Sequence, residues 1–578
     1  MLSLFTLRII SVGLYNCNMT FKLPKFLNPS AMWLEKQQTS ILSAATIMTA
    51  ASGVSAIAGL LIKRLLNHYF IENSREALEA FWLAFQIPDM MFQLIILGAL
   101  SAAFIPIFTT SKKQSLKKAF HMSSIMMNIL LLVFVAVGLF VFIFAREITV
   151  FRTGSAIQPG QIDVVVNLTR LMLLAQFFFA VSNFMTGILQ SFQRFIIPAL
   201  SPIFYNLGII LGVLLFSSQL GIYSAGVGVV IGAFLHLAIQ VPLVYKLGFK
   251  YSFSLNFKYP GIKQFFKIMP PRVFAIGASE IRKLALGFFT TSLGSLSYLS
   301  MFYALTLMTV PIRLFGVPIG QASLPFLSEK SGEGERDKFI GLVLQSLNQI
   351  SFLTFPATVL LLILRIPAVR LVFGTRDFPW ATTVLLGKLV AILAISITVQ
   401  ALAHLLNRAF YALKDTKTPL LIAGIDLVIY FSLSYYFVFH TGWGVIGIAF
   451  ATVITAFAEL ILLLLFLNKK VGGLLSKAFW LPQFKMVVAA FFMAVSLYLP
   501  FRVLDELVFN TTKTIELIAL SVTTGTIGMI VYLYFAALLD IRELKIVADL
   551  INNFGPWRKI LARSEEVLLE TGVEGEEL

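Results

Sequence analysis

Charged side chains lie inside several stretches of this sequence that are otherwise apolar enough to cross a membrane. Residues 265–290 carry the densest group, which consists of Arg272, Glu280, Arg282 and Lys283. On a helix these residues form a charged stripe about 16 Å long, in which Glu280 lies one turn from Lys283 and can neutralise it. Charges at such depth indicate either a substrate or ion pathway or an internal salt-bridge network. Because bases outnumber acids in the stripe, we favour the pathway.

Further charged residues lie in or beside the neighbouring apolar stretches: Lys63, Arg64, Glu79, Asp89, Arg313 and Asp426. Lys63 and Arg64 either bind an anionic ligand or extend their charged ends to the membrane interface while their stems stay in apolar surroundings. Asp426 is predicted either as a ligand of a coupling ion or as the partner of a cation in residues 265–290.

Two prolines interrupt these stretches, and we expect each to kink its helix. Pro88 lies in residues 80–108 and Pro311 in residues 297–327. Proline removes a backbone hydrogen bond, which lipid tolerates only where a neighbouring helix or a water-filled cavity satisfies the freed carbonyl. Residues 80–108 therefore either line a cavity or form a kinked packing helix in which Asp89 bonds to a neighbour.

Composition identifies the chain as a polytopic membrane protein. Of its 578 residues, 58% are hydrophobic and 13% charged, and the mean hydropathy is +0.88, which a soluble domain of this size could not carry without aggregating. The net charge of +17 would suit nucleic acid. However, the basic residues lie in short loops between apolar stretches, where they indicate which loops lie on the cytoplasmic side of the membrane. We therefore expect no nucleic-acid partner. The single cysteine, Cys17, excludes an internal disulfide and a cysteine-built metal site.

Fourteen apolar stretches are long enough to span a bilayer, and together they predict an all-α fold. They are 41–64, 80–108, 121–145, 163–190, 196–216, 222–245, 265–290, 297–327, 339–364, 383–407, 418–439, 443–467, 485–501 and 515–537. Lys and Arg concentrate in the loops on one side, which predicts that both termini are cytoplasmic.

A faint internal repeat divides the first twelve stretches into two halves. ALSAAFIPIF (99–108) resembles IGQASLPFLS (319–328), and each follows an internal proline. Six plus six spans with broken helices predict two lobes around a cavity, with alternating access by rocking. The predicted divisions are a basic extension at 1–38, an N-lobe at 39–250, a C-lobe at 251–470, two further spans at 471–539 and a cytoplasmic tail at 540–578. The extension has no small-residue cleavage site, so we do not expect a removable signal peptide, and Met19 is a second candidate start.

No motif indicates bond-making chemistry. The sequence offers no paired acids, no nucleophile with a base, and no cluster of His, Cys and carboxylates at metal-ligand spacing. We therefore expect a transporter and not an enzyme, with no cofactor. Its driving force would be a Na⁺ or H⁺ gradient or the membrane potential.

Several longer motifs resemble the MurJ (MviN) family of lipid II flippases, which belongs to the same MOP superfamily as the MATE exporters. The matching motifs are EAFWLAFQIPD with GALSAAFIPIF (79–108), PALSPIFYNLGII (198–210), VIGAFLHLAIQVPLVYKLGF (230–249), residues 292–329 and RAFYALKDTKTP (408–419). The resemblance implies a MATE-like V-shaped pair of lobes with two extra C-terminal helices. It also implies a bacterial plasma-membrane flippase that moves an undecaprenyl-diphosphate-linked cell-wall precursor to the outer leaflet, with cell-wall synthesis proteins as possible partners.

The chain departs from the family at the cavity arginines of spans 1, 2 and 8. The matching positions fall near Ala56 and Ile62, at Phe92 or Gln93, and at Thr306, and none of these residues is basic. A diphosphate that enters a low-dielectric cavity needs fixed cations. The hypothesis is that Arg272, Arg282, Lys283 and Arg313 replace the missing arginines, with Lys63 and Arg64 as further candidates and with Glu79, Asp89 and Glu280 as cavity acids. One alternative is another transporter of the same superfamily, either a flippase of another lipid-linked oligosaccharide or a cation-coupled small-molecule exporter. The other alternative is a non-transporting scaffold of the cell-wall machinery.

Overall fold

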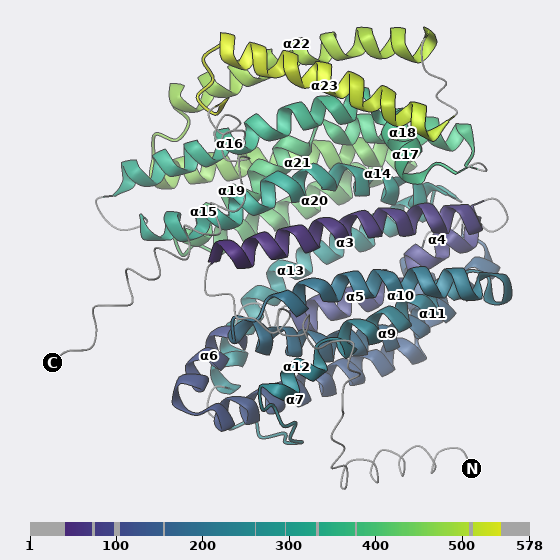
Figure 1. Cartoon of the computed structure of the whole chain (residues 1–578), viewed down its shortest axis with the longest axis vertical. Helices are drawn as coiled ribbons and strands as arrows, with labels where there is room; N and C mark the ends of the chain where they lie inside the picture. Colours follow the sequence, from purple (N-terminus) through teal and green to yellow (C-terminus); the bar gives the residue numbers. More distant parts are fainter. Residues whose placement is uncertain are drawn as a thin grey trace, which may run out of the picture.

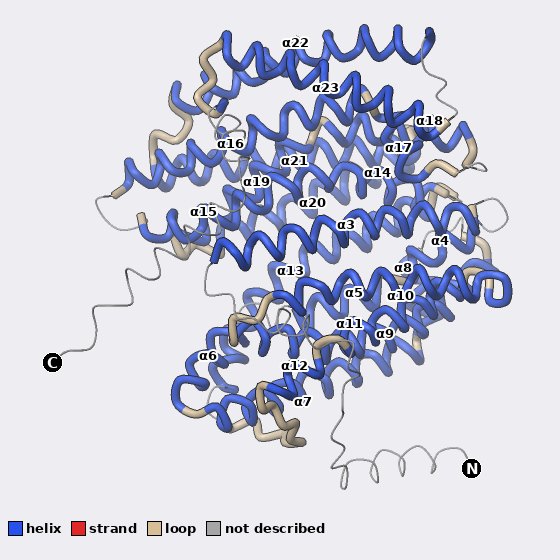
Figure 2. Tube along the Cα trace, viewed as in Figure 1, coloured by secondary structure: helices blue, strands red, loops and turns tan. Residues whose placement is uncertain are grey.

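A computed structural model describes residues 41–71, 75–97, 104–153, 157–259, 262–294, 296–330, 335–375, 378–507 and 513–544. The predicted N-terminal extension and most of the predicted C-terminal tail lie outside these residues. Within them, all regular structure is helical (Figure 2), which confirms the predicted all-α fold.

The helices follow the predicted apolar stretches. The first half of the chain forms α3 (Ile41–Phe70), α4 (Arg75–Ala84), α5 (Gln86–Phe92), α6 (Ile105–Gln114), α7 (Leu116–Ile143), α8 (Ala145–Arg152), α9 (Pro159–Ser191), α10 (Ile196–Leu220), α11 (Tyr223–Ala238) and α12 (Val241–Lys246). The second half forms α13 (Ile262–Thr291), α14 (Ser297–Pro311), α15 (Val317–Glu329), α16 (Arg336–Ile363), α17 (Arg365–Phe373), α18 (Trp380–Ala394), α19 (Ile397–Ala412), α20 (Lys417–Phe439), α21 (Gly444–Val471), α22 (Lys477–Leu507) and α23 (Thr514–Leu538). In the described part, ten helices are long and apolar enough to cross a membrane, or eleven if the bent pair α18 and α19 is one span. The predicted count of fourteen is consistent with this number and stays a prediction.

Both proline-containing stretches are broken. The first is divided into α4, α5 and the π-helix η2 (Gln93–Leu97), and the second into α14, the π-helix η4 (Ile312–Gly316) and α15. Pro88 cannot donate to the carbonyl of Ala84, and that carbonyl accepts a hydrogen bond from the Thr169 hydroxyl of α9 at 3.4 Å instead. A neighbouring helix thus satisfies the group that the proline frees, as helices in lipid require.

The apolar cores differ between the two ends of the helices. We call these the α4 end, where α4 and α17 lie, and the α6 end, where α6 and α15 lie (Figure 1). At the α4 end a single core joins residues of both halves, for example Leu66 and Leu83 with Tyr303 and Phe373. Toward the α6 end, one core joins α7, the second half of α9 and the start of α13, and a separate core joins α16, α19 and the second half of α21. The two halves are therefore packed together at the α4 end. At the α6 end their cores are separate, except that the start of α13 packs with the first half.

Helices α22 and α23 lie at the edge of the bundle (Figure 1), where both pack against α16 and α23 also contacts α17. The Tyr532 hydroxyl of α23 donates to the Phe352 carbonyl of α16 at 2.9 Å. This position outside the two halves agrees with their absence from the sequence repeat.

The turn of the RAFYALKDTKTP motif is organised by one carboxylate. Asp415 accepts hydrogen bonds from the backbone N–H groups of Lys417 and Thr418 at the start of α20, and from the Lys470 ammonium of α21 at 2.7 Å. Partial burial of this carboxyl raises its pKa, but the hydrogen bonds from Lys470 and Thr418 outweigh that effect and lower the pKa to about 2. Asp415 is thus charged at neutral pH and ties the N-terminus of α20 to the end of α21.

Helices α10 and α11 approach each other through glycines. A Cβ atom added at Gly208 would lie 2.3 Å from the Gly232 Cα atom, and one added at Gly212 would lie 2.3 Å from the Gly228 Cα atom. Backbones this close are typical of small-xxx-small contacts between membrane helices.

Gly208→Ala is therefore expected to destabilise the protein by about 1–3 kcal/mol, because the new methyl group can be accommodated only by separating two backbones. The effect is measured as the unfolding temperature of detergent-purified protein, with size-exclusion chromatography used to monitor the fraction that stays folded. Gly424→Ala is the control, since a Cβ there meets nothing within 4 Å. Equal unfolding temperatures for the two variants would contradict the close packing of α10 and α11.

Candidate functional site

Lys63 and Arg313 are two cations from different halves of the chain that are close enough for the charge of one to act on the other. The Lys63 ammonium of α3 lies 5.3 Å from the Trp82 ring centroid and 5.8 Å from that of Phe302. Arg313 is an exposed residue of the π-helix η4, and its charge acts on Lys63. Among the described side chains, neither cation has a carboxylate within ion-pair distance. The pair thus concentrates positive charge, with two aromatic rings beside Lys63.

The charged stripe of α13 is divided between two different surroundings. Lys283 bonds to Glu280 at 2.7 Å and lies 3.8 Å from Asp89 of α5. Arg282 points to α20 and α21, where it pairs with Asp426 at 2.8 Å. Both cations therefore already have acidic partners, unlike Lys63 and Arg313. The side chain of Arg272 lies outside the described residues, although its backbone belongs to α13.

Arg64 makes a contact between helices of the two halves. Its guanidinium donates to the Leu371 carbonyl of α17 at 2.7 Å. One turn further along α3, Asn67 donates to the Phe373 carbonyl at 2.9 Å and accepts from the Tyr303 hydroxyl at 2.7 Å. Arg64 is therefore placed to hold α3 against α17, and it is not grouped with Lys63.

Glu79 caps the start of α14 from a different helix. Leu296, the residue before α14, has φ of 70° and no side chain that can cap the helix. The buried Glu79 carboxylate accepts instead from the backbone N–H groups of Leu296, Tyr298 and Leu299 at 3.0–3.3 Å and from the Gln161 amide at 3.2 Å. A negative charge at a helix N-terminus also stabilises the helix dipole. Glu79 thus fastens α4 to α14 at the α4 end.

Arg152 and Tyr298 strengthen the same end. Arg152 is buried in α8, where it donates to the Gln86 side chain and, at 2.7 Å, to the Leu83 carbonyl beside the break between α4 and α5. Gln86 in turn donates to the Tyr298 hydroxyl at 3.0 Å. Arg152 was not predicted as a site residue because it lies in a segment between the predicted spans, where a single arginine looks like an ordinary loop cation. The short helical pattern AREITVFR around it is the only signal that would have distinguished it.

Asp426 and the unpredicted Glu459 form a second polar group in the interior. The Asp426 carboxylate pairs with Arg282, which is one of the two interpretations that the sequence left open. Glu459 of α21 interacts electrostatically with both residues and accepts a hydrogen bond from Asn407 at 3.5 Å. Among the described residues, no group of three or more His, Cys, Asp and Glu side chains is placed to hold a metal ion.

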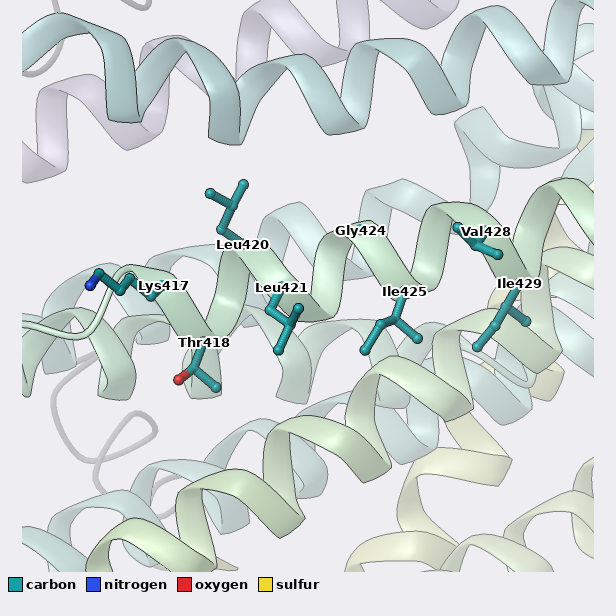
Figure 3. Close-up of a pocket in the computed structure, with 8 residues that line it drawn as sticks. All are labelled: Lys417, Thr418, Leu420, Leu421, Gly424, Ile425, Val428 and Ile429. Atoms are coloured by element: carbon teal, nitrogen blue, oxygen red, sulfur yellow. The ribbon is translucent and has the colours of Figure 1, made fainter.

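A hollow of about 800 Å³ lies along one face of α20 (Figure 3). Its lining is mainly apolar, including Leu421, Ile425 and Val428, with Lys417 and Thr418 at one end. None of the predicted site residues lines it. The hollow therefore does not take part in the charged site described above.

Comparisons with known proteins agree on one family. The family model described as "Lipid II flippase MurJ" matches residues 66–518 of the 578. The chain is 25% identical over 526 residues to a probable lipid II flippase MurJ of Bdellovibrio bacteriovorus. This match covers 90% of this chain and 98% of the relative. It is 27% identical over 445 residues to the lipid II flippase MurJ of Burkholderia cenocepacia, which covers 76% and 85% respectively.

Solved structures share the fold. A lipid II flippase MurJ in an inward closed conformation matches with a TM-score of 0.70 and 22% identity, and the match covers 88% of this chain and all of that one. An inward-facing multidrug resistance MATE transporter of the MOP superfamily matches with a TM-score of 0.60 and 14% identity, over 73% and 95% of the two chains. At these identities the likeness concerns the fold alone.

Proposed function

The chain belongs to the MurJ family of lipid II flippases, and from this premise we propose that it moves lipid II from the inner to the outer leaflet of the bacterial plasma membrane. It is a multi-pass membrane protein. In the proposed topology both termini are cytoplasmic, so the α6 end faces the cytoplasm and the α4 end faces outward. Binding and conformational change accomplish the transport, with no bond made or broken in the cargo.

The observation that carries the proposal is the pair Lys63 and Arg313. A diphosphate that leaves water for a low-dielectric site needs cations whose charge is not already neutralised. These two cations come from spans of opposite halves and have no acidic partner among the described residues, whereas Arg282 and Lys283 do. Trp82 and Phe302 beside Lys63 add apolar surface that would face the rest of the head group. The proposed head-group site therefore contains fewer cations than the set predicted from the sequence.

The two kinds of core support alternating access. The shared core at the α4 end holds the halves together there. The separate cores at the α6 end allow the halves to part if the start of α13 stays with the first half. Cargo would thus enter from the α6 end, between the halves. Opening the α4 end would require the Glu79 contacts to α14 to break.

A small-molecule exporter is the second candidate, since MATE transporters share the fold. Hydrophobic cationic drugs need acidic and aromatic linings, whereas Lys63 and Arg313 would repel them. The charge of the site therefore favours an anionic cargo.

Complementation tests the proposal. The chain is expressed in a bacterium depleted of its own MurJ, and growth is followed together with the exposure of lipid II on the outer leaflet. Restored growth and exposure are the expected result. Normal membrane insertion of the protein without either effect would contradict lipid II flipping and would leave another lipid-linked sugar, or a non-transporting scaffold, as the function.

A further inference from the structure

Arg152 of α8 is a buried cation at the α4 end that has no acidic partner. The residue is only 8% exposed. Among the described side chains, no carboxylate lies within ion-pair distance of it, and its Nε atom has no hydrogen-bond partner. Its two other nitrogens donate to neutral groups, the Gln86 side chain and the Leu83 carbonyl. A neutral amide could donate to the same two oxygens without the cost of burying a charge, so a structural role alone does not explain the arginine.

Residues of the second half of the chain cover Arg152 and its partner Gln86. Gln86 donates to the Tyr298 hydroxyl of α14 at 3.0 Å, and Tyr298 interacts electrostatically with Arg152. On α13, Gly287 leaves the room that Gln86 occupies, because a Cβ atom there would lie 2.7 Å from Gln86 Oε1. Arg152 and Gln86 belong to the first half, whereas Tyr298 and Gly287 belong to the second. Separation of the halves at the α4 end therefore releases Gln86 and exposes the Arg152 guanidinium.

Arg152 lies on the outward side of the proposed head-group site. Along α14, Tyr298 is one turn closer to the α4 end than Phe302, and the two rings stack with their centroids 6.0 Å apart. The Phe302 ring lies beside Lys63, whereas Arg313 lies further inward, in η4 after the end of α14. The three cations Arg313, Lys63 and Arg152 therefore follow one another toward the α4 end.

The short helix α8 has the character of a helix at the membrane surface. Val150 and Phe151 are 52% and 88% exposed, whereas Thr149 and Arg152 are buried against the protein. A helix with one exposed apolar face at the end of membrane spans is typical of the boundary between lipid head groups and acyl chains. The diphosphate of a lipid in the outer leaflet lies at the same boundary. Arg152 is therefore at the depth that a transported head group reaches.

We propose that Arg152 forms an exit site for the diphosphate of the cargo. When the α4 end opens, its guanidinium binds the diphosphate in place of Gln86 and draws it outward from Lys63 and Arg313. Arginine suits this role because its fork of donors matches phosphate oxygens, and its Nε atom is free without the loss of any bond. Closure of the α4 end restores the bond to Gln86 and displaces the anion. The identity of the cargo rests on the proposed flippase function, whereas the existence of an anion site at Arg152 does not.

Inorganic diphosphate is the probe for the site, and the opening of the α4 end is the first readout. A ligand that binds only the open arrangement shifts the population toward it. Spin labels on Gly160→Cys of α9 and Ala381→Cys of α18 report the distance between the halves, since both residues are exposed at the α4 end. The full chain with Cys17→Ser is used in lipid nanodiscs, without cargo. Diphosphate should raise the open population at least about threefold, compared with sodium chloride of equal ionic strength.

Variants of two arginines on α8 show whether the effect belongs to Arg152. Arg152→Gln should abolish the increase, and Arg152→Lys should keep part of it because the charge remains. Arg146→Gln is the matched control, because Arg146 is exposed and paired with Asp163, and it should respond like the wild type. An absent response of the wild type, or an equal response of Arg152→Gln, would overturn the exit site.

Calorimetric titration with diphosphate measures binding separately from opening. It is made with Lys63→Gln and Arg313→Gln in place, so that the proposed inward site does not contribute. Arg152→Gln in this background should weaken the affinity for diphosphate at least about tenfold. Equal affinities with and without Arg152 would overturn the site.

Transport tests whether the site acts at the exit step. In proteoliposomes, Arg152→Gln is expected to lower the maximal flipping rate about tenfold and to change the half-saturating lipid II concentration less than about twofold, because capture at the α6 end does not involve Arg152. A changed half-saturating concentration with an unchanged maximal rate would overturn the exit role. Absence of flipping by the wild type, with the diphosphate response present, would count against the proposed function and not against the anion site.

Discussion

Replacing Lys63 and Arg313 together by glutamine is expected to lower lipid II flipping on the order of a hundredfold or more. A hydrogen bond between a charged side chain and a charged ligand contributes roughly 1.5–3 kcal/mol, so that losing two corresponds to at least this factor in affinity. Each single variant should lose roughly tenfold, because the remaining cation still faces the diphosphate. Growth in the MurJ-depleted strain and outer exposure of lipid II measure the loss, and membrane insertion of each variant is checked in parallel.

The control for this prediction removes the same charge elsewhere. Arg170→Gln with Lys388→Gln takes two cations from α9 and α18. Arg170 contacts Phe142, and neither cation acts on the charge of Lys63, so transport should stay within about twofold of the wild type. Lys63→Arg with Arg313→Lys keeps both charges and should retain more transport than the glutamine pair. If the glutamine pair transports normally, the head-group site lies elsewhere. The sequence-based set of Arg272, Arg282, Lys283 and Arg313 would then be neutralised together.

Glu79→Ala is expected to open the α4 end. The change removes the acceptor of three backbone N–H groups and one amide, and it leaves buried donors at the start of α14 without partners. Leaving such groups unsatisfied costs roughly 1–3 kcal/mol each where water cannot replace the partner, so the closed arrangement should lose about 3 kcal/mol relative to the open one. We expect transport to fall as well, because a cycle of alternating access needs the α4 end to close.

Labelling with a maleimide that does not cross membranes measures this opening. Ser300 of α14 is buried, so Ser300→Cys in a Cys17→Ser background reports access from the α4 end. The labelling rate should rise at least tenfold on Glu79→Ala. Glu76→Ala, one turn earlier on α4, should leave the labelling rate unchanged, because the only side-chain bond of Glu76 among the described residues is that from Gln158 at 3.5 Å. No increase for Glu79→Ala would show that the carboxylate does not hold this end closed.

The sequence was sufficient to predict the features that depend on composition and local geometry. Hydropathy and length alone predict the helices, since a backbone in lipid must satisfy its own hydrogen bonds. The Glu280–Lys283 contact is likewise visible in the sequence, because helical spacing brings residues three apart onto neighbouring positions whatever the rest of the chain does. Pro88 predicts a freed carbonyl for the same local reason. The identity of its partner, Thr169, is not a local property.

Only the tertiary structure decided which charges are paired and which are not. Arg282 and Asp426 are 144 positions apart, and Glu79 lies 217 positions from Leu296, so helical spacing places no limit on either contact. The sequence treated Arg282, Lys283 and Arg313 alike, yet the packing of α13 against α5, α20 and α21 gives the first two acidic partners and leaves Arg313 beside Lys63. The physical reason is that the surroundings of a buried charge determine whether it has a partner of opposite sign. Those surroundings are supplied by helices whose order in space is determined by packing and not by spacing along the chain.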